Sequence, residues 1–314
     1  MLGDQIAQRT AFGKCLVGIA EEFPNMVVLD PDVGPSTQTG IFKDRYPDRF
    51  YNTGIAEQNT VGMAAGMANT GLIPWVSAFA VFLAHRSGDQ IRNSVAHPRT
   101  NVKLNGSYAG LPTGRAGATH SSVEDLAIIR SLPNMTIIEP ADAVETAYFT
   151  RMATAMEGPV YLRTVRCEVP VIFNDNHHPD FGKAILLREG TDVSLITTGM
   201  MTARVLEAGE LLRKKGISAD ILHIPFIKPI DKDAIAGTAR KTGLIVTVEN
   251  HSVIGGLGSA VCETVADKAP CLVHRLGYQD IFLESGDDEV LFDRYGLNAA
   301  RVSEFVLRQL RKQV

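Results

Sequence analysis

The chain has 314 residues and a formal net charge of −4, from 31 lysines and arginines against 35 aspartates and glutamates. With no excess of basic residues and no Lys/Arg stripe, nucleic acid is not an expected partner. No apolar run reaches the roughly 18–20 residues that cross a bilayer, and the N-terminal residues lack the pattern of a signal peptide. We therefore expect a cytoplasmic protein with no membrane contact, long enough for two domains.

The first half of the sequence alternates strand-like and helix-like segments. Expected helices cover residues 6–23, 57–70, 81–96, 123–132 and 143–156, and expected strands cover 26–30, 72–79, 101–106, 135–141 and 158–165. Regular alternation of this kind predicts an α/β fold, with helices on both faces of a parallel sheet.

Turn-forming residues replace this pattern between about 165 and 190, and the alternation then begins again. The second series has expected strands at 193–199, 219–224, 244–250 and 271–277, and expected helices at 202–216, 231–243, 256–268 and 299–313. The sequence thus predicts two consecutive parallel-sheet α/β domains, at 1–170 and 189–314, joined by a linker at 171–188.

Ligands of open parallel sheets bind in loops beyond the carboxyl ends of the strands. The loops in question are 31–40, 52–57, 77–86, 106–122, 163–168 and 249–258. Glu57 falls in one of them, at the start of a helix rich in small residues. An acid there is either a partner of the helix dipole, worth ~0.3–1 kcal/mol, or a group with a chemical role.

Several other residues in these loops allow both a structural and a functional interpretation. Phe79, Phe82 and His85 share one helical face and are more often core residues than a stacking platform. His120 follows a glycine-rich loop and precedes two serines whose spacing to Glu124 and to the next acid fits a capping box, which predicts a helix start.

Two arginines, Arg163 and Arg166, follow the apolar residues 158–162 of an expected strand and could bind a phosphate or simply face solvent. Arg9, in the first helix, is on its own expected to be a solvated residue. The glycines at 255, 256 and 258 favour a tight strand-to-helix turn over a phosphate cradle. Four widely spaced cysteines, with no CxxC, favour reduced thiols, and we expect no metal ligands in this chain.

The order of these motifs is specific. "GIAEQNTVGMAAGMANTGLIPWVSAFAVF" (54–82), followed by "GATHSSVEDLAIIRSLPNMTIIEPAD" (117–142), resembles the pyrimidine-binding domain of transketolases. The remainder, from "TDVSLITTG" through "KPID" to "VENHSVIGGLG" (248–258), resembles their C-terminal domain. The resemblance covers essentially the whole chain.

This resemblance implies thiamine diphosphate as the cofactor. Glu57 matches the glutamate that hydrogen-bonds the far ring nitrogen of the aminopyrimidine and thereby activates it. Phe79 matches the aromatic residue that stacks on this ring, with Phe82 beside it. Ile55 matches the bulky residue that bends the cofactor, and Asp32 matches a polar residue close to it.

Other matches concern the substrate. His120 corresponds to a catalytic histidine that contacts the sugar hydroxyls. Arg9, Ser36 and Arg166 correspond to groups that hold the substrate phosphate, and Arg163 is the near alternative. The implied reaction is the transfer of a two-carbon ketol unit between phosphorylated sugars.

Two positions depart from the family pattern. Ala116 stands where the family commonly has an acid before G-x-T-H, so one sugar-hydroxyl contact is missing. This change favours an unusual sugar, such as apulose 4-phosphate, over the ordinary pentose phosphates. His85, a further candidate for cofactor binding, stands where transketolases often place a tyrosine.

The sequence lacks the GDG…N motif with which such enzymes hold the diphosphate and its metal ion. The resemblance therefore implies a split enzyme whose N-terminal-half partner subunit supplies this motif and holds Mg²⁺ or Ca²⁺. The cofactor would lie between chains of an α2β2 heterotetramer. The alternatives are the beta subunit of a 2-oxo acid dehydrogenase decarboxylase, a deoxyxylulose-phosphate-synthase-like enzyme, and a non-catalytic scaffold subunit.

Overall fold

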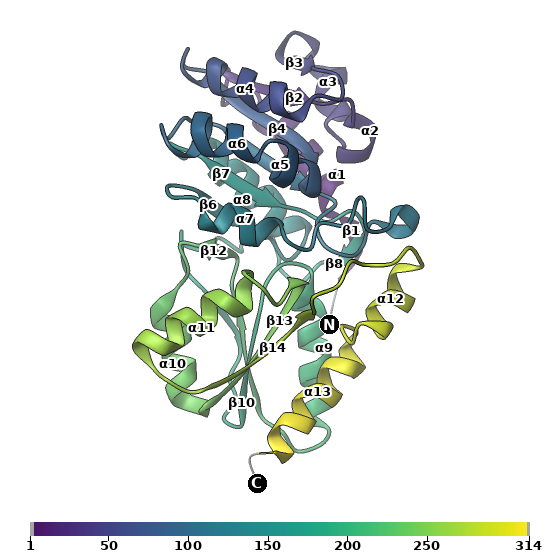
Figure 1. Cartoon of the computed structure of the whole chain (residues 1–314), viewed down its shortest axis with the longest axis vertical. Coiled ribbons are helices and arrows are strands. Elements are labelled where there is room, and N and C mark those ends of the chain that lie inside the picture. Colours follow the sequence, from purple (N-terminus) through teal and green to yellow (C-terminus); the bar gives the residue numbers. More distant parts are fainter. Residues whose placement is uncertain (1–2, 313–314) are drawn as a thin grey trace.

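A computed structural model describes residues 3–312, which form two α/β units stacked along the long axis of the molecule (Figure 1). The described residues of the first unit are built on a sheet with the strand order β12-β6-β7-β5-β4-β2-β3. Six of these strands are parallel: β2 (Met26–Asp30), β3 (Phe50–Asn52), β4 (Ile73–Phe79), β5 (Lys103–Ser107), β6 (Thr136–Ile138) and β7 (Val160–Arg163). Strands β2, β4, β5 and β7 are buried along their whole length, as strands covered on both faces are.

Helices cover both faces of this sheet. One face carries α1 (Gln8–Ile19), α3 (Gly40–Arg45) and α8 (Ala143–Ala155), which pack around Phe12, Trp75 and Phe149. The other face carries α4 (Glu57–Ala68), α5 (Ala80–Arg86) and α7 (Asp125–Ser131). The short α2 (Gly34–Thr37) follows β2. A small antiparallel pair, β1 (Gln5–Ala7) and β8 (Glu168–Pro170), lies apart from the main sheet.

The described part of the second unit is built on a five-stranded sheet with the order β14-β13-β10-β11-β9. Its strands are β9 (Ile185–Arg188), β10 (Val193–Thr197), β11 (Ala219–His223), β13 (Leu244–Ser252) and β14 (Leu272–Tyr278), and β9 is antiparallel to its neighbour β11. Its helices are α9 (Met201–Arg213), α10 (Lys232–Thr242), α11 (Leu257–Lys268), α12 (Asp288–Arg294) and α13 (Ala299–Arg311). Helix α9 packs on α13, and α10 packs on α11.

The two units share their cores. One apolar cluster runs from Val76 and Leu104 of the first sheet to Ile196 and Ile245 of the second. Moreover, β12 (Phe226–Lys228) leaves the second unit and pairs antiparallel with β6 at the edge of the first sheet. The α/β class with two sheet-based units is confirmed.

The structure differs from the sequence-based expectation at three places. The expected linker 171–188 contains regular structure, because its last four residues form β9. The helix expected at 81–96 is interrupted at Ser87 and continues as α6 (Gly88–Gln90) and a π-helical turn, η2 (Ile91–Ala96). The predicted capping box is wrong, since α7 begins at Asp125 without a side-chain cap.

Within residues 3–312, none of the helices combines the length and the apolar character needed to span a bilayer.

Candidate active site

An aromatic cluster marks the carboxyl edge of the first sheet. Phe79 ends β4 and Tyr108 follows β5, and their rings stack with centroids 4.1 Å apart and planes inclined by 20°. Phe82, on α5, lies on Phe79 at 5.6 Å. His120, from the long loop after β5, meets both phenylalanines edge-on, at 5.8 Å and 5.4 Å. The structure thus brings Phe79, Phe82 and His120 together into one cluster.

Glu57, the first residue of α4, is linked to this cluster through Arg86. It is only 4% exposed, and its Oε1 accepts a hydrogen bond of 2.9 Å from Nη1 of Arg86. The Arg86 guanidinium also lies over the Phe82 ring, 4.0 Å from its centroid. A buried carboxylate without a partner would be costly. The ion pair and the positive end of the helix dipole together offset that cost.

An open hollow of about 620 Å³ adjoins Glu57. Its lining is formed by residues 55–59 at the start of α4 and by His85 and Arg86 at the end of α5. Ile55 is 76% exposed at this hollow, which is unusual for an isoleucine. His85 lies at the rim with its Nε2 2.7 Å from Oε1 of Glu124.

A second group, rich in positive charge, surrounds Tyr108. Nη1 of Arg9 donates to the backbone oxygen of Ser36 at 2.9 Å and to the Tyr108 hydroxyl at 3.3 Å. The guanidinium carbons of Arg9 and Arg166 lie 5.9 Å and 5.8 Å from the centre of the Tyr108 ring. Nε of Arg9 is buried and lacks a hydrogen-bond partner among the described residues. Two cations with a spare donor make this corner suitable for an anion.

Asp32 occupies a different position. It has a φ of +66° directly after β2, and its Oδ1 accepts a 2.9 Å hydrogen bond from Asn52 at the end of β3. This contact ties Asp32 to the strand end and not to the aromatic cluster.

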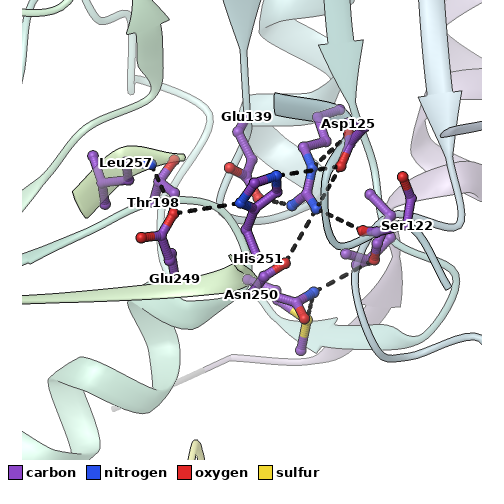
Figure 2. A network of polar contacts seen from close by, with 12 residues as sticks. Ser122, Asp125, Glu139, Thr198, Glu249, Asn250, His251 and Leu257 are labelled. Carbon is purple, nitrogen blue, oxygen red and sulfur yellow. Dashed lines mark hydrogen bonds and ion pairs between the residues drawn. The ribbon is translucent and has the colours of Figure 1, made fainter. Parts of the chain in front are cut away.

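Arg163 is not available to a substrate phosphate. The structure thus contradicts the prediction that Arg163 is an alternative phosphate-binding residue. Its side chain is fully buried and contacts Asp125 and Glu139 of the first unit and Asn250 of the second. Figure 2 shows these three residues in one polar network. Nε and Nη2 donate to Asp125, and Nη1 donates to Glu139 at 2.5 Å. Nη2 also reaches the backbone oxygens of Ser122 and Asn250, so that each nitrogen of the guanidinium is engaged.

Burial and the Arg163 guanidinium shift the pKa values of the acidic and histidine side chains in this network. Burial alone would raise the pKa of Asp125, but the Arg163 guanidinium holds it below its usual value. Burial raises the pKa of Glu139, and it raises the pKa of Glu249 to about 8. Burial also lowers the pKa of His251 to about 4. The network connects the two units, and its residues do not line the hollow.

The glycine-rich turn after β13 does not form a phosphate cradle. Both oxygens of Glu249 accept backbone hydrogen bonds at the start of α11, from Leu257 at 2.7 Å and Gly258 at 2.9 Å. The helix N-terminus is therefore already occupied by a carboxylate of the chain itself.

Three residues of the site were not predicted from the sequence. Tyr108 connects the aromatic cluster to Arg9 and Arg166, and its place after an expected strand was the available signal. Arg86 follows Phe82 by four residues, which places both on one helical face. Glu124 was interpreted as a cap, although its carboxylate binds His85.

No group of three or more His, Cys, Asp or Glu side chains suited to a metal ion occurs among the described residues. The four cysteines, Cys15, Cys167, Cys262 and Cys271, are free thiols.

Comparisons with known proteins agree with this geometry. Residues 4–171 match the transketolase pyrimidine binding domain, and residues 182–302 match the transketolase C-terminal domain. A "putative transketolase C-terminal section" of Methanocaldococcus jannaschii is 40% identical over 97% of this chain and 96% of that protein. A protein of Phocaeicola vulgatus, named as one of the subunits of an apulose-4-phosphate transketolase, is 36% identical over 99% of this chain and 100% of its own length.

Solved structures give the same result. A "split gene transketolase, inactive beta4 tetramer" is 44% identical, with a TM-score of 0.91 over 98% of this chain and 99% of that one. The transketolase of Campylobacter jejuni shares the fold, with a TM-score of 0.82 at 21% identity, but this chain spans only 47% of its length. The chain therefore belongs to the transketolase family, in which it corresponds to the half that carries the pyrimidine binding and C-terminal domains.

Proposed function

We propose that this chain is the C-terminal-half subunit of a split, thiamine-diphosphate-dependent transketolase, and that Glu57 activates the aminopyrimidine of the cofactor. The observation that carries the proposal is a buried carboxylate at a helix start, which borders an open hollow and is linked through Arg86 to the ring of Phe82. A buried acid in a cleft next to a flat apolar surface is typical of a group with a chemical role.

The residues present fit the pyrimidine end of the cofactor. Phe79 and Phe82 offer ring faces for stacking, and the Glu57 carboxyl group, in the lining of the hollow, would hydrogen-bond the edge of the bound ring. The exposed Ile55 and the rim residue His85 would flank the bound group, and Asp32 would lie further out. When bound, thiamine diphosphate supplies the carbon nucleophile and the electron sink of ketol transfer.

The protein side chains then have distinct tasks. Glu57, which is only 4% exposed, would hold or release a proton at its carboxyl group. The rings of Phe79 and Phe82 would orient the aminopyrimidine. His120, which contacts both phenylalanines, would hydrogen-bond hydroxyl groups of the sugar.

We further propose that Arg9, Ser36 and Arg166 bind the anionic end of the sugar. The support is their convergence on Tyr108 and the spare donor at Nε of Arg9. Relatives named for apulose 4-phosphate and for 6-deoxy-6-sulfo-D-fructose indicate that family members of this length differ in their sugars. Ala116, exposed in the loop before His120, is the residue that we connect to an unusual sugar.

The proposal includes a partner. The diphosphate and its Mg²⁺ or Ca²⁺ would be held by an N-terminal-half subunit with a GDG…N motif, which supplies the oxygen ligands that these ions prefer. The relative solved as a split gene transketolase supports a division of the enzyme between two chains. We expect an α2β2 heterotetramer in the cytoplasm, where the four free thiols would remain reduced.

The test is Glu57→Gln in the chain assembled with its partner, which is first identified by affinity purification from the native host. Turnover of sugar phosphates should fall by about 100-fold or more, because the amide cannot exchange a proton with the ring. Glu22→Gln, an exposed position paired with Arg151, is the matched control. Normal turnover of the Glu57 variant would refute the assigned role. Purification of this chain without a partner would favour a non-catalytic subunit.

A further inference from the structure

Arg86 forms an ion pair with the carboxylate that the proposed function assigns to the cofactor. Its Nη1 binds Oε1 at 2.9 Å, and its guanidinium covers Phe82 at 4.0 Å. The carboxylate is almost fully buried, whereas half of the Arg86 side chain is exposed. A cation thus reaches from the solvent side into the hollow and covers the acid there.

The aminopyrimidine and Arg86 compete for the same place. A ring nitrogen that hydrogen-bonds Oε1 needs the place where Nη1 of Arg86 lies, 2.9 Å from this oxygen. A ring nitrogen with a proton binds the carboxylate, but its positive charge is repelled by the arginine. A ring that binds Oε1 therefore displaces Arg86 from this oxygen.

The contacts of Arg86 allow it to leave. Among the described residues, the hydrogen bond that holds its side chain is the one to Glu57, and the other contact is the ring face of Phe82. Arg163 provides the contrast, since five hydrogen bonds fix it in a buried position. A half-exposed guanidinium with one hydrogen bond regains solvent when it moves away.

We propose that Arg86 is the resting counter-ion of Glu57 and is displaced when the aminopyrimidine binds. It is a positioning residue that acts through Glu57: it stabilises the carboxylate while the site is empty and gives up Oε1 to the ring. This inference rests on the proposed function.

The experiment measures the affinity of the assembled enzyme for thiamine diphosphate with Mg²⁺, by isothermal titration calorimetry. Arg86→Gln should bind the cofactor about fivefold more tightly, because binding no longer breaks an ion pair of roughly 1 kcal/mol. Arg86→Lys, which retains the charge, should restore the affinity of the natural protein. In a Glu57→Gln background, Arg86→Gln should change the affinity by less than about twofold.

A second measurement uses the chain without cofactor. There Arg86→Gln should lower the melting temperature, and Arg86→Lys should largely restore it, because the counter-ion stabilises the empty site.

Equal or weaker cofactor binding by Arg86→Gln would overturn the inference and make Arg86 a supporting contact of the loaded site. If Glu57→Gln abolishes turnover in the same preparations, the proposed function survives that result. If the assembled enzyme does not bind thiamine diphosphate at all, both proposals are refuted.

Discussion

At the scale of single residues, burial distinguishes Arg163 from Arg166, although the two arginines are only three positions apart in the sequence. Arg166 lies against the Tyr108 ring, whereas Arg163 forms buried ion pairs with Asp125 and Glu139 in the network between the units. Removal of one member of such a network leaves an unpaired buried charge, which costs far more than the pair itself contributes. The network therefore fixes the relative position of the two units and of the loop that carries His120.

His251 makes the stability of this network depend on pH. Its pKa is lowered by burial to about 4, so between pH 6.5 and 4 the unfolded chain takes up a proton that the folded chain does not. The free energy of unfolding should therefore fall by about 3 kcal/mol from this group as the pH drops through that window. Glu249, with a raised pKa, acts in the opposite direction, since its contribution is lost as the pH rises toward 8.

Urea titrations of the natural protein and of His251→Gln, at several pH values between 4 and 7, measure this contribution as the difference between the two curves. The exposed His97, replaced in the same way, controls for the loss of an imidazole. Parallel curves for the natural protein and the His251 variant would contradict the prediction.

At the scale of elements, the 106–122 loop depends on a close contact with the second unit. Gly110 has φ of +71°, and a Cβ there would lie 2.1 Å from Nδ2 of Asn250. The Asn250 side chain also accepts hydrogen bonds from Leu111 N at 3.0 Å and from the Tyr278 hydroxyl at 2.7 Å. The loop is thus held where glycine alone fits.

Gly110→Ala should destabilise the protein by about 2 kcal/mol or more, from the unfavourable backbone conformation and from displacement of Asn250. Thermal or urea unfolding measures this change. Gly237→Ala is the control, because Gly237 lies in α10 with open space around it and should gain about 0.5–1 kcal/mol of helix propensity. Similar stabilities of the two variants would show that the loop adapts to the extra methyl group.

The sequence predicted most elements, because buried strands leave continuous apolar runs such as the one at 73–79. It failed where tertiary contacts decide the local structure. The serines before α7 fit a capping box, but Oγ of Ser121 instead bonds Thr113 and the backbone of Gly117. Three of the residues proposed from the sequence, Phe79, Phe82 and His120, lie in one cluster, whereas Tyr108 and Glu124 were not predicted as site residues. The sequence could not distinguish the buried Arg163 from Arg166 at the site. Burial against a second unit leaves no trace in the residues next to an arginine in the chain.

At the scale of the whole molecule, the exposed surface near the site is unusual for a free protein. Ile55 is largely exposed, and Tyr51 and Met63 are also exposed apolar residues of the same region. The outward face of α4 carries small or uncharged residues, namely Gln58, Asn59, Gly62, Met63 and Gly66. A surface of this composition suits close contact with another chain.

Ile55→Asp should weaken assembly with the N-terminal-half partner by about 10-fold or more, because it places a charge in the proposed interface. The folding stability of the isolated chain should not change, since this side chain is exposed. Analytical ultracentrifugation of the mixed subunits measures the effect. Leu272→Asp, at the beginning of β14 and far from the hollow, is the control. An unaffected complex would place the partner elsewhere on the surface.

Strand β12 has a consequence for any attempt to divide the chain. Because it pairs with β6, a fragment that ends in the 171–188 segment would lose the outer strand of its own sheet. The freed edge would expose unpaired backbone groups of β6, and the shared apolar cluster would face water. Such a fragment is prone to aggregate, although family boundaries fall at residues 171 and 182. The boundary seen in sequence is thus not a place where the protein can be cut into two autonomous folding units.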